Sequence, residues 1–167
     1  MLAGRVRCAT GWLLGLCLAG SGSQAADRYV ACAGQEPDWP YTTWASAASN
    51  LQHAVDAAVP GETVWISNSV HRLESTVVVS NAITLRGFAE GAALDGGGTL
   101  RCLDLGTAAA VVADLAVVGG YAAESGGGIR MQNAVVTNCV VSNNVAVLDG
   151  GGIWVPANGS GLLVDSR

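Results

Sequence analysis

The sequence predicts an all-β protein in which short strands stack into a parallel β-solenoid (β-helix), with one N-terminal capping helix. Three observations predict this fold. Brief β-branched runs are interrupted by glycine, asparagine or serine, a 24-residue segment recurs without gaps, and a convincing helical pattern occurs at one place only. Half of the 167 residues are hydrophobic and only 13% are charged, which argues against a disordered chain.

The first 25 residues have the pattern of a secretory signal peptide. Arg5 and Arg7 provide positive charge before a short apolar core at 11–19. Ser23 and Ala25 then stand at the −3 and −1 positions of a signal-peptidase site. The core is too short to span a bilayer, which takes about 20 residues. We therefore expect cleavage of residues 1–25, no membrane span in the mature chain, and a protein that is secreted or held at the outer membrane or cell surface.

The net charge narrows the choice of partners. Without the leader, six arginines face 13 acidic residues, which gives a net charge of −7 and leaves no lysine. The acidic balance and the absence of a basic run argue against nucleic acid or an anionic membrane surface as a partner. An extracellular polysaccharide or a host or cell surface is the partner that we expect.

Three of the five cysteines remain once the leader is removed: Cys32, Cys102 and Cys139. They are far apart and include no C-x-x-C pair, so they form neither a disulfide framework nor a zinc site, and at most one bridge. We expect them to be small buried side chains. Cys17 is not expected to carry lipid, because Leu16 is too large for a lipoprotein site.

The helical pattern lies at residues 44–60, after a lead-in segment at 26–43. Five apolar residues recur there at spacings of four and three, as on one face of a helix: Trp44, Ala48, Leu51, Val55 and Ala58. Thr43 is the expected N-cap, and Pro60 with Gly61 ends the pattern. We expect this helix to cover the otherwise open end of the stack.

Residues 61–167 are the predicted coils of the solenoid. The predicted strands include 64–66, 77–79, 83–85, 111–112, 135–136 and 139–141. Residues 111–134 match residues 135–158 at 8 of 24 positions, including Gly-Gly-Gly-Ile at 126–129 and 150–153. A third copy begins at residue 162, and residues 94–98 resemble residues 148–152 at a looser spacing. One such unit cannot bury its apolar edge alone, so stacking with Ile129 over Ile153 is predicted.

Two parts of the sequence resemble known β-solenoid families. Leu-Gln-His-Ala-Val-Asp-Ala-Ala at 51–58, with Gly-Glu-Thr-Val-Trp-Ile at 61–66, resembles the N-terminal part of right-handed parallel β-helix (pectin-lyase-like) proteins. Residues 140–144 and 150–153 resemble polymorphic outer-membrane protein repeats, which pair F-x-x-N with G-G-A/G-I. Here valine replaces the phenylalanine, and Gly119 and Gly120 replace the asparagines of the preceding copy. The resemblance implies that the coils are right-handed. Solenoids of this kind occur in enzymes and in non-catalytic surface proteins alike.

The sequence identifies no catalytic, cofactor-binding or metal-binding residues. A glycoside hydrolase needs two or three convergent carboxylates, and a pectate-type lyase needs calcium-binding acids with an arginine or lysine base. Acids of the coils instead occur singly, among them Asp95, Asp104, Asp114, Glu124, Asp149 and Asp165. We therefore expect no cofactor, and nothing in the sequence supports a Ca²⁺ site.

One polar column stands out in the repeat. Asp114 and Asn138 are equivalent at the 24-residue period, and Asp165 fits the third copy after a three-residue insertion. Stacked residues of this kind predict a ladder at a solenoid corner, with side chains bonded to backbone along the stack. The alternative is a stripe that faces a carbohydrate or a cation.

Aromatic and histidine residues have structural interpretations. Trp39, Tyr41 and Trp44 are expected to pack the lead-in segment against the cap, and the alternative is a sugar-stacking platform. His53 and His71 are expected to be ordinary surface side chains.

The expected function is that of an exported, non-catalytic surface or adhesin-type protein. The chain is expected to be the N-terminal part of a longer protein. The alternative is a polysaccharide lyase or glycoside hydrolase whose catalytic coils lie beyond residue 167.

Overall fold

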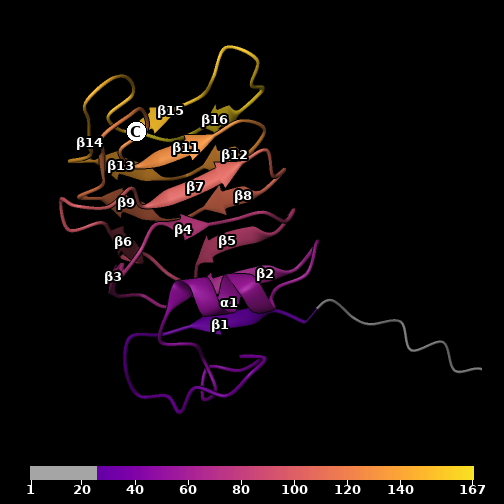
Figure 1. Cartoon of the computed structure of the whole chain (residues 1–167). Helices are drawn as coiled ribbons and strands as arrows, with labels where there is room; N and C mark the ends of the chain where they lie inside the picture. Colours follow the sequence, from indigo (N-terminus) through magenta and orange to yellow (C-terminus); the bar gives the residue numbers. More distant parts are fainter. Residues whose placement is uncertain (1–25) are drawn as a thin grey trace, which may run out of the picture.

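The computed structural model describes residues 26–167, and the predicted signal peptide lies outside these residues. The described chain is a parallel β-solenoid of about four turns (Figure 1). Successive coils stack from the N-terminal helix to the C-terminus, and this confirms the predicted architecture. No helix within residues 26–167 is long and apolar enough to cross a membrane.

The coils contribute strands to three main sheets, and every strand pair is parallel. Sheet 1 comprises β1 (Arg28–Val30), β2 (Thr63–Ile66), β5 (Thr84–Gly87), β8 (Val111–Ala113), β12 (Val135–Thr137) and β16 (Leu162–Val164). Sheet 2 comprises β3 (Val70–Arg72), β6 (Ala93–Asp95), β9 (Ala116–Val118) and β13 (Val140–Ser142). Sheet 3 comprises β4 (Val77–Val78), β7 (Leu103–Gly106), β11 (Ile129–Met131) and β15 (Ile153–Trp154). A short pair, β10 (Tyr121–Ala122) with β14 (Val145–Ala146), lies between sheets 2 and 3 along the chain.

The strand register confirms the repeat. Ile129 pairs directly with Ile153, as the 24-residue period predicts. Val135 pairs with Leu162, 27 residues later, which confirms the third copy and its three-residue insertion. The looser match of residues 94–98 to residues 148–152 is not a repeat, because Asp95 pairs with Val118 in sheet 2 whereas residue 149 lies between β14 and β15.

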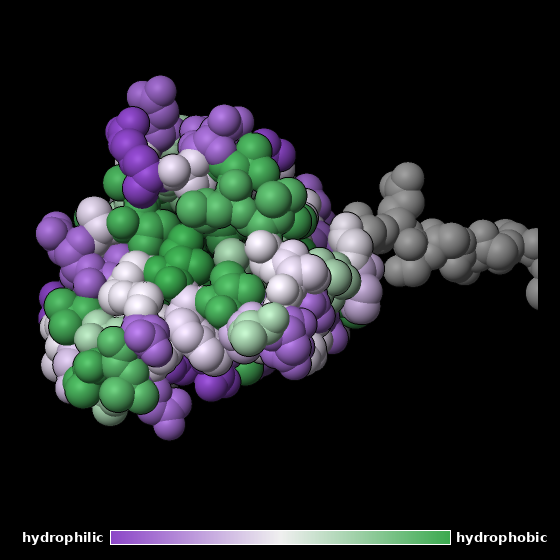
Figure 2. All heavy atoms as spheres, turned by 90° about the horizontal axis from the view of Figure 1, so that it is seen from above, coloured by the Kyte–Doolittle hydropathy of each residue, from purple (hydrophilic) through white to green (hydrophobic). Residues whose placement is uncertain are grey.

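The core is a stack of apolar side chains inside the coils. Val64, Leu85, Val112 and Val136 pair successively in sheet 1, and each is fully buried. Burial of one such side chain contributes about 1.5–3 kcal/mol relative to its exposure. At the C-terminal end apolar side chains reach the surface (Figure 2), and the exposed ones in the last coils include Val145, Val147, Leu148, Leu162 and Leu163.

The helix is shorter than the predicted span of 44–60. Helix α1 comprises Leu51–Ala57, and its N-cap is Asn50 rather than Thr43. Thr43 caps only an isolated turn, in which its Oγ1 accepts a hydrogen bond from the Ser46 backbone at 3.2 Å. The chain then runs beside β1, where the Ala48 N–H donates to the Tyr29 carbonyl at 2.8 Å. This pairing requires extended backbone and therefore delays the start of the helix.

The helix caps one edge of the stack, as predicted. In Figure 1, α1 lies at the N-terminal end, below β4. The Gln52 side chain donates to the Val78 carbonyl at 3.0 Å and accepts from the Val78 N–H at 2.8 Å. A side-chain amide thus takes the place of a neighbouring strand at the open edge of sheet 3, which would otherwise present unpaired backbone groups.

The glycine run at 126–128 allows adjacent coils to come close together. Gly126 adopts a positive φ of 78°, which costs an L-residue with a Cβ atom. A Cβ atom on Gly127 would lie 2.1 Å from the Val145 carbonyl oxygen, so only glycine fits at this position without moving the backbone. The glycine run therefore has a structural role at this corner.

Two expectations about exposure are wrong. His71 is not a surface side chain: strand alternation in β3 turns Val70 and Arg72 outward and His71 inward, where only 4% of it is exposed. Cys32 is exposed, whereas Cys102 and Cys139 are buried as predicted. All three cysteines are free, so the one bridge that the sequence allowed is not formed.

Candidate functional site

A groove runs along the corner between sheets 1 and 2. Its volume is about 550 Å³, and its lining includes Trp65, Arg86, Phe88, Asp114, Asn138 and Arg167. These residues come from successive coils, so the groove follows the stacking direction of the solenoid. It combines exposed aromatic surface at its N-terminal end with charged and amide side chains further along.

The polar part of the groove is a ladder of three side chains: Arg86, Asp114 and Asn138. The Arg86 Nε atom donates to Asp114 Oδ2 at 2.6 Å, and Asn138 Nδ2 donates to Asp114 Oδ1 at 2.7 Å. The predicted stacking of Asp114 and Asn138 is therefore present. The bonds differ from the prediction, because they join side chain to side chain rather than side chain to backbone.

The backbone explains which residue types occupy this column. Asp114, Asn138 and Asp165 have φ angles of 58°, 49° and 46°, in the left-handed region. Aspartate and asparagine tolerate this conformation better than other residues with a Cβ atom. Asp165 holds the equivalent corner position after β16 and is exposed. The geometry of the corner therefore selects the residue types of the column, and the side chains of Asp114 and Asn138 face the groove.

The predicted bonding to backbone occurs at Asn144 instead. Its Oδ1 atom accepts from the Gly120 N–H at 2.7 Å, and its Nδ2 atom donates to the Val117 carbonyl at 2.9 Å. Asn143, the residue before it, is left-handed at φ 55°, as is its counterpart Gly119 at 61°. Glycine can therefore replace the first asparagine of the motif in the preceding copy without a change of backbone shape.

The environment of Asp114 keeps it ionised. The hydrogen bond from Asn138 lowers the pKa of Asp114 most, and the hydrogen bond from Arg86 lowers it next. Burial raises this pKa, but less than either hydrogen bond lowers it, and the charge of Arg86 adds a smaller decrease. Both carboxylate oxygens already accept hydrogen bonds. A glycosidase acid requires the opposite, a carboxyl group whose pKa is raised so that it can donate a proton. Asp114 is suited to holding neighbours in place and not to acid catalysis.

The aromatic part of the groove belongs to a band of four rings: Tyr29, Trp44, Phe88 and Trp65. Their centroids are separated by 4.7 Å from Tyr29 to Trp44, 4.8 Å from Trp44 to Phe88 and 6.1 Å from Phe88 to Trp65, all edge-on. The Arg86 guanidinium lies 5.8 Å from the centre of the Trp65 ring and joins the band to the polar ladder. Phe88 is 58% exposed, so this ring is available to a ligand.

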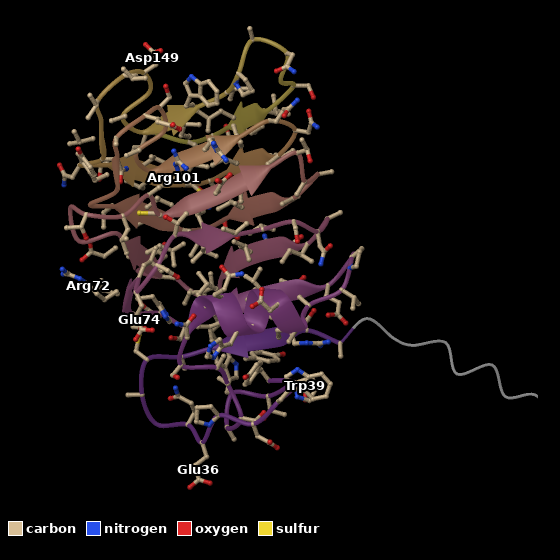
Figure 3. All side chains as sticks on the ribbon, viewed as in Figure 1. Glu36, Trp39, Arg72, Glu74, Arg101 and Asp149 are labelled. Carbon is tan, nitrogen blue, oxygen red and sulfur yellow. The ribbon has the colours of Figure 1, made fainter. Side chains whose placement is uncertain are left out.

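The three aromatic residues singled out in the lead-in segment do not form one platform. Trp39 is 71% exposed and lies at the side of the lead-in loops, whose outer end carries Glu36 (Figure 3). Tyr41 packs against the core, and Trp44 joins the band beside the groove. The sequence analysis did not identify Phe88 or Trp65 as residues of a site. The one signal in the sequence was that Phe88 is the only phenylalanine in the chain.

Several of the single acids are paired with arginines rather than with one another. Asp104 accepts two hydrogen bonds from Arg130, at 2.6 and 3.1 Å, and Arg101 lies 3.5 Å from it. Asp95 pairs with Arg72 at 3.4 Å. In the part of the chain that the structure describes, no three histidine, cysteine or acidic residues gather as a metal site.

Comparison with known proteins adds no family to this description. No protein-family model, curated protein or solved structure matches the chain. The groove must therefore be interpreted from its own geometry and chemistry.

Proposed function

We propose that the protein is an exported, non-catalytic surface protein of the adhesin type, whose groove binds an extracellular polysaccharide. Two resemblances support this class: that of residues 51–58 and 61–66 to pectin-lyase-like proteins, and that of residues 140–144 and 150–153 to polymorphic outer-membrane protein repeats. The observation that carries the proposal is the groove itself, which places the exposed Phe88 ring beside the polar ladder.

The two halves of the groove suit the two kinds of surface on a sugar. A pyranose ring has an apolar face that packs on an aromatic ring, and hydroxyl groups that both donate and accept hydrogen bonds. Phe88 offers the aromatic surface, and the amide of Asn138 has a carbonyl oxygen and a second N–H to offer beyond its bond to Asp114. Because Asp114 balances the charge of Arg86, the groove favours a neutral polymer over a strongly anionic one.

Direct binding measurements test this proposal. We expect soluble neutral oligosaccharides to bind the full chain in isothermal titration calorimetry, and Phe88→Ala to weaken binding about fivefold to tenfold, because stacking on one aromatic ring contributes about 1 kcal/mol. Tyr121→Ala is the matched control, since Tyr121 is an exposed aromatic residue outside the groove. If Trp39→Ala abolished binding and Phe88→Ala did not, the site would lie on the lead-in segment instead.

Catalysis is tested on neutral polymers and on acidic, uronate-containing polysaccharides, because a lyase needs a carboxyl group beside the proton that it removes. The bonds that occupy Asp114 support a binding role, so we expect neither new reducing ends nor the absorbance of an unsaturated product. Activity that is present in the wild-type protein and lost in Asp114→Asn would overturn the non-catalytic assignment and favour a lyase or hydrolase.

A further inference from the structure

A buried histidine contacts an exposed cysteine at the edge of sheet 2, outside the groove. The Cys32 Sγ atom lies 3.3 Å from His71 Nδ1 and 3.5 Å from the Val70 carbonyl oxygen. The Ser69 hydroxyl donates to the same sulfur at 3.4 Å. Cys32 follows β1 and His71 lies in β3, so folding of the lead-in segment brings together two residues that are 39 positions apart.

The hydrogen bonds of His71 determine which ring nitrogen faces the thiol as an acceptor. His71 Nε2 lies 3.1 Å from the Ser67 carbonyl oxygen, which can only accept, so we assign the ring proton to Nε2. The hydroxyls of Ser67 and Ser69 lie at the same distance from this nitrogen. Nδ1 is then free to accept the thiol proton of Cys32. Burial lowers the pKa of His71, more than its bond to the Ser67 backbone raises it, and the ring therefore remains neutral near pH 7.

This thiol is accessible, in contrast to the other two cysteines of residues 26–167. Cys32 borders a small cavity of about 50 Å³, whose lining also includes Ser49, His71, Arg72 and Glu74. Arg72 and Glu74 lie at the edge of the molecule (Figure 3), so the cavity is next to the surface. Cys102 and Cys139 are buried, and burial raises the pKa of Cys102 to about 11.

We propose that Cys32 is a modification site that forms mixed disulfides with small-molecule disulfides, with His71 as the base that activates its thiol. His71 Nδ1 takes the proton from Cys32, and the thiolate attacks one sulfur of the disulfide. The new bond to Cys32 Sγ forms as the S–S bond of the small molecule breaks. The departing thiolate takes the proton from His71 and leaves as a thiol. Cys32 is oxidised and the departing sulfur is reduced, so no other oxidant is required.

The geometry assigns separate roles to the neighbouring groups. The Ser69 O–H donor stabilises the thiolate as it forms, and the Ser67 carbonyl holds the ring in the required tautomer. The nucleophile Cys32 thus contacts the base His71, and the Ser67 carbonyl orients that base, which is the arrangement expected of an activated thiol. This inference does not depend on the polysaccharide proposal, because the groove and Cys32 share no lining residue.

The test uses the full chain with Cys8→Ser and Cys17→Ser, so that leader cysteines do not react. The chain is incubated with oxidised glutathione at pH 7, and peptide mass spectrometry locates and times the modification. We expect Cys32 to be modified while Cys102 and Cys139 stay unmodified until urea unfolds the chain. We expect His71→Gln to slow modification at least about tenfold, because it removes a general base but keeps a polar side chain.

Two further variants keep the test decisive if His71→Gln does not fold, as judged by circular dichroism. Ser69→Ala removes the hydroxyl that donates to the sulfur and should slow the reaction severalfold. Ser49→Ala changes the rim of the same cavity without a contact to the sulfur and should leave the rate unchanged. Equal rates in wild type, Ser69→Ala and a folded His71→Gln would overturn the proposal, as would faster modification of Cys102 or Cys139 than of Cys32.

Discussion

Asp114 provides the sharpest test of the corner geometry, because its side chain and its backbone make separable contributions to stability. Loss of the side chain removes the bond to Asn138, worth about 1 kcal/mol, and the ion pair to Arg86. Arg86 is 48% exposed, so solvent reduces that pair to about 0.2–1 kcal/mol. Asp114→Gly should therefore lower the free energy of unfolding by about 1–2 kcal/mol, plus a few tenths from the greater flexibility of unfolded glycine.

Asp114→Ala should be less stable than Asp114→Gly, although alanine is the larger residue. At a φ of 58° alanine pays about 1–2 kcal/mol for the left-handed conformation, and it recovers about 0.4–1 kcal/mol from its stiffer unfolded chain. The net difference is about 0–1.6 kcal/mol, and its central value of about 0.8 kcal/mol is resolved by equilibrium unfolding in urea. Asp149 is the control, an exposed acid without a positive φ, where the order of the alanine and glycine variants should reverse. An Asp114→Ala protein as stable as Asp114→Gly would refute the left-handed corner.

The same carboxylate predicts a pH dependence of stability. Its bonds to Asn138 and Arg86 lower the pKa of Asp114 in the folded protein below the value of about 3.9 in an unfolded chain. A lowered pKa means that the stabilisation is fully present above the unfolded pKa and is lost as pH falls through the folded one. Wild type should therefore lose more stability than Asp114→Asn between about pH 5 and pH 2. Parallel curves in urea titrations across this range would contradict the assignment.

Two further substitutions test the edge and the bends of the stack. Gln52→Ala should lower the free energy of unfolding in urea by about 1 kcal/mol, since it removes both hydrogen bonds to Val78. His53→Ala, on the exposed side of α1, is the control and should change it by at most about 0.3 kcal/mol. Gly127→Ala should lower the free energy of unfolding by about 3 kcal/mol or prevent folding, because its Cβ would lie 2.1 Å from a carbonyl oxygen. Gly98→Ala is the control: its Cβ would have open space, so it should lower the free energy of unfolding by only about 1 kcal/mol, for its positive φ.

The register could be predicted where consecutive segments of the sequence align without a gap or with one short insertion. Residues 111–134 and 135–158 align without a gap, so the pairing of Ile129 with Ile153 follows from sequence identity alone. Earlier coils have no common length: Trp65 pairs with Arg86, 21 residues later, and Arg86 pairs with Ala113 after a further 27. Turns of variable length hide this register. The aromatic half of the groove, which depends on it, was therefore not predictable.

The wrong predictions near the N-terminus, which concern the start of the helix and the exposure of Cys32 and His71, have a different cause. Ala48 is buried beside Leu51, as a helical face predicts, but its backbone hydrogen bonds go to β1. Periodicity reports which side chains face the core and not how the backbone reaches them. Likewise, neither Cys32 nor His71 has a sequence partner at a recognisable spacing. Their contact arises because the lead-in segment places Cys32 against the open edge of β3.

The polar half of the groove contributes to both stability and ligand binding, whereas the aromatic half contributes to ligand binding and less to stability. Asp114 and Asn138 face the groove, yet their left-handed backbone and mutual bond also hold adjacent coils in register. Changes there should lower coil stability and ligand affinity together. Phe88 is largely exposed and lies outside the buried core, but its ring packs edge-on against Trp44 and Trp65. Its truncation should therefore lower affinity about fivefold to tenfold while it lowers the free energy of unfolding by about 0.5–1.5 kcal/mol. If Phe88→Ala lowered the free energy of unfolding but left affinity unchanged, the ring would be a packing residue, and the groove would have no binding surface of its own.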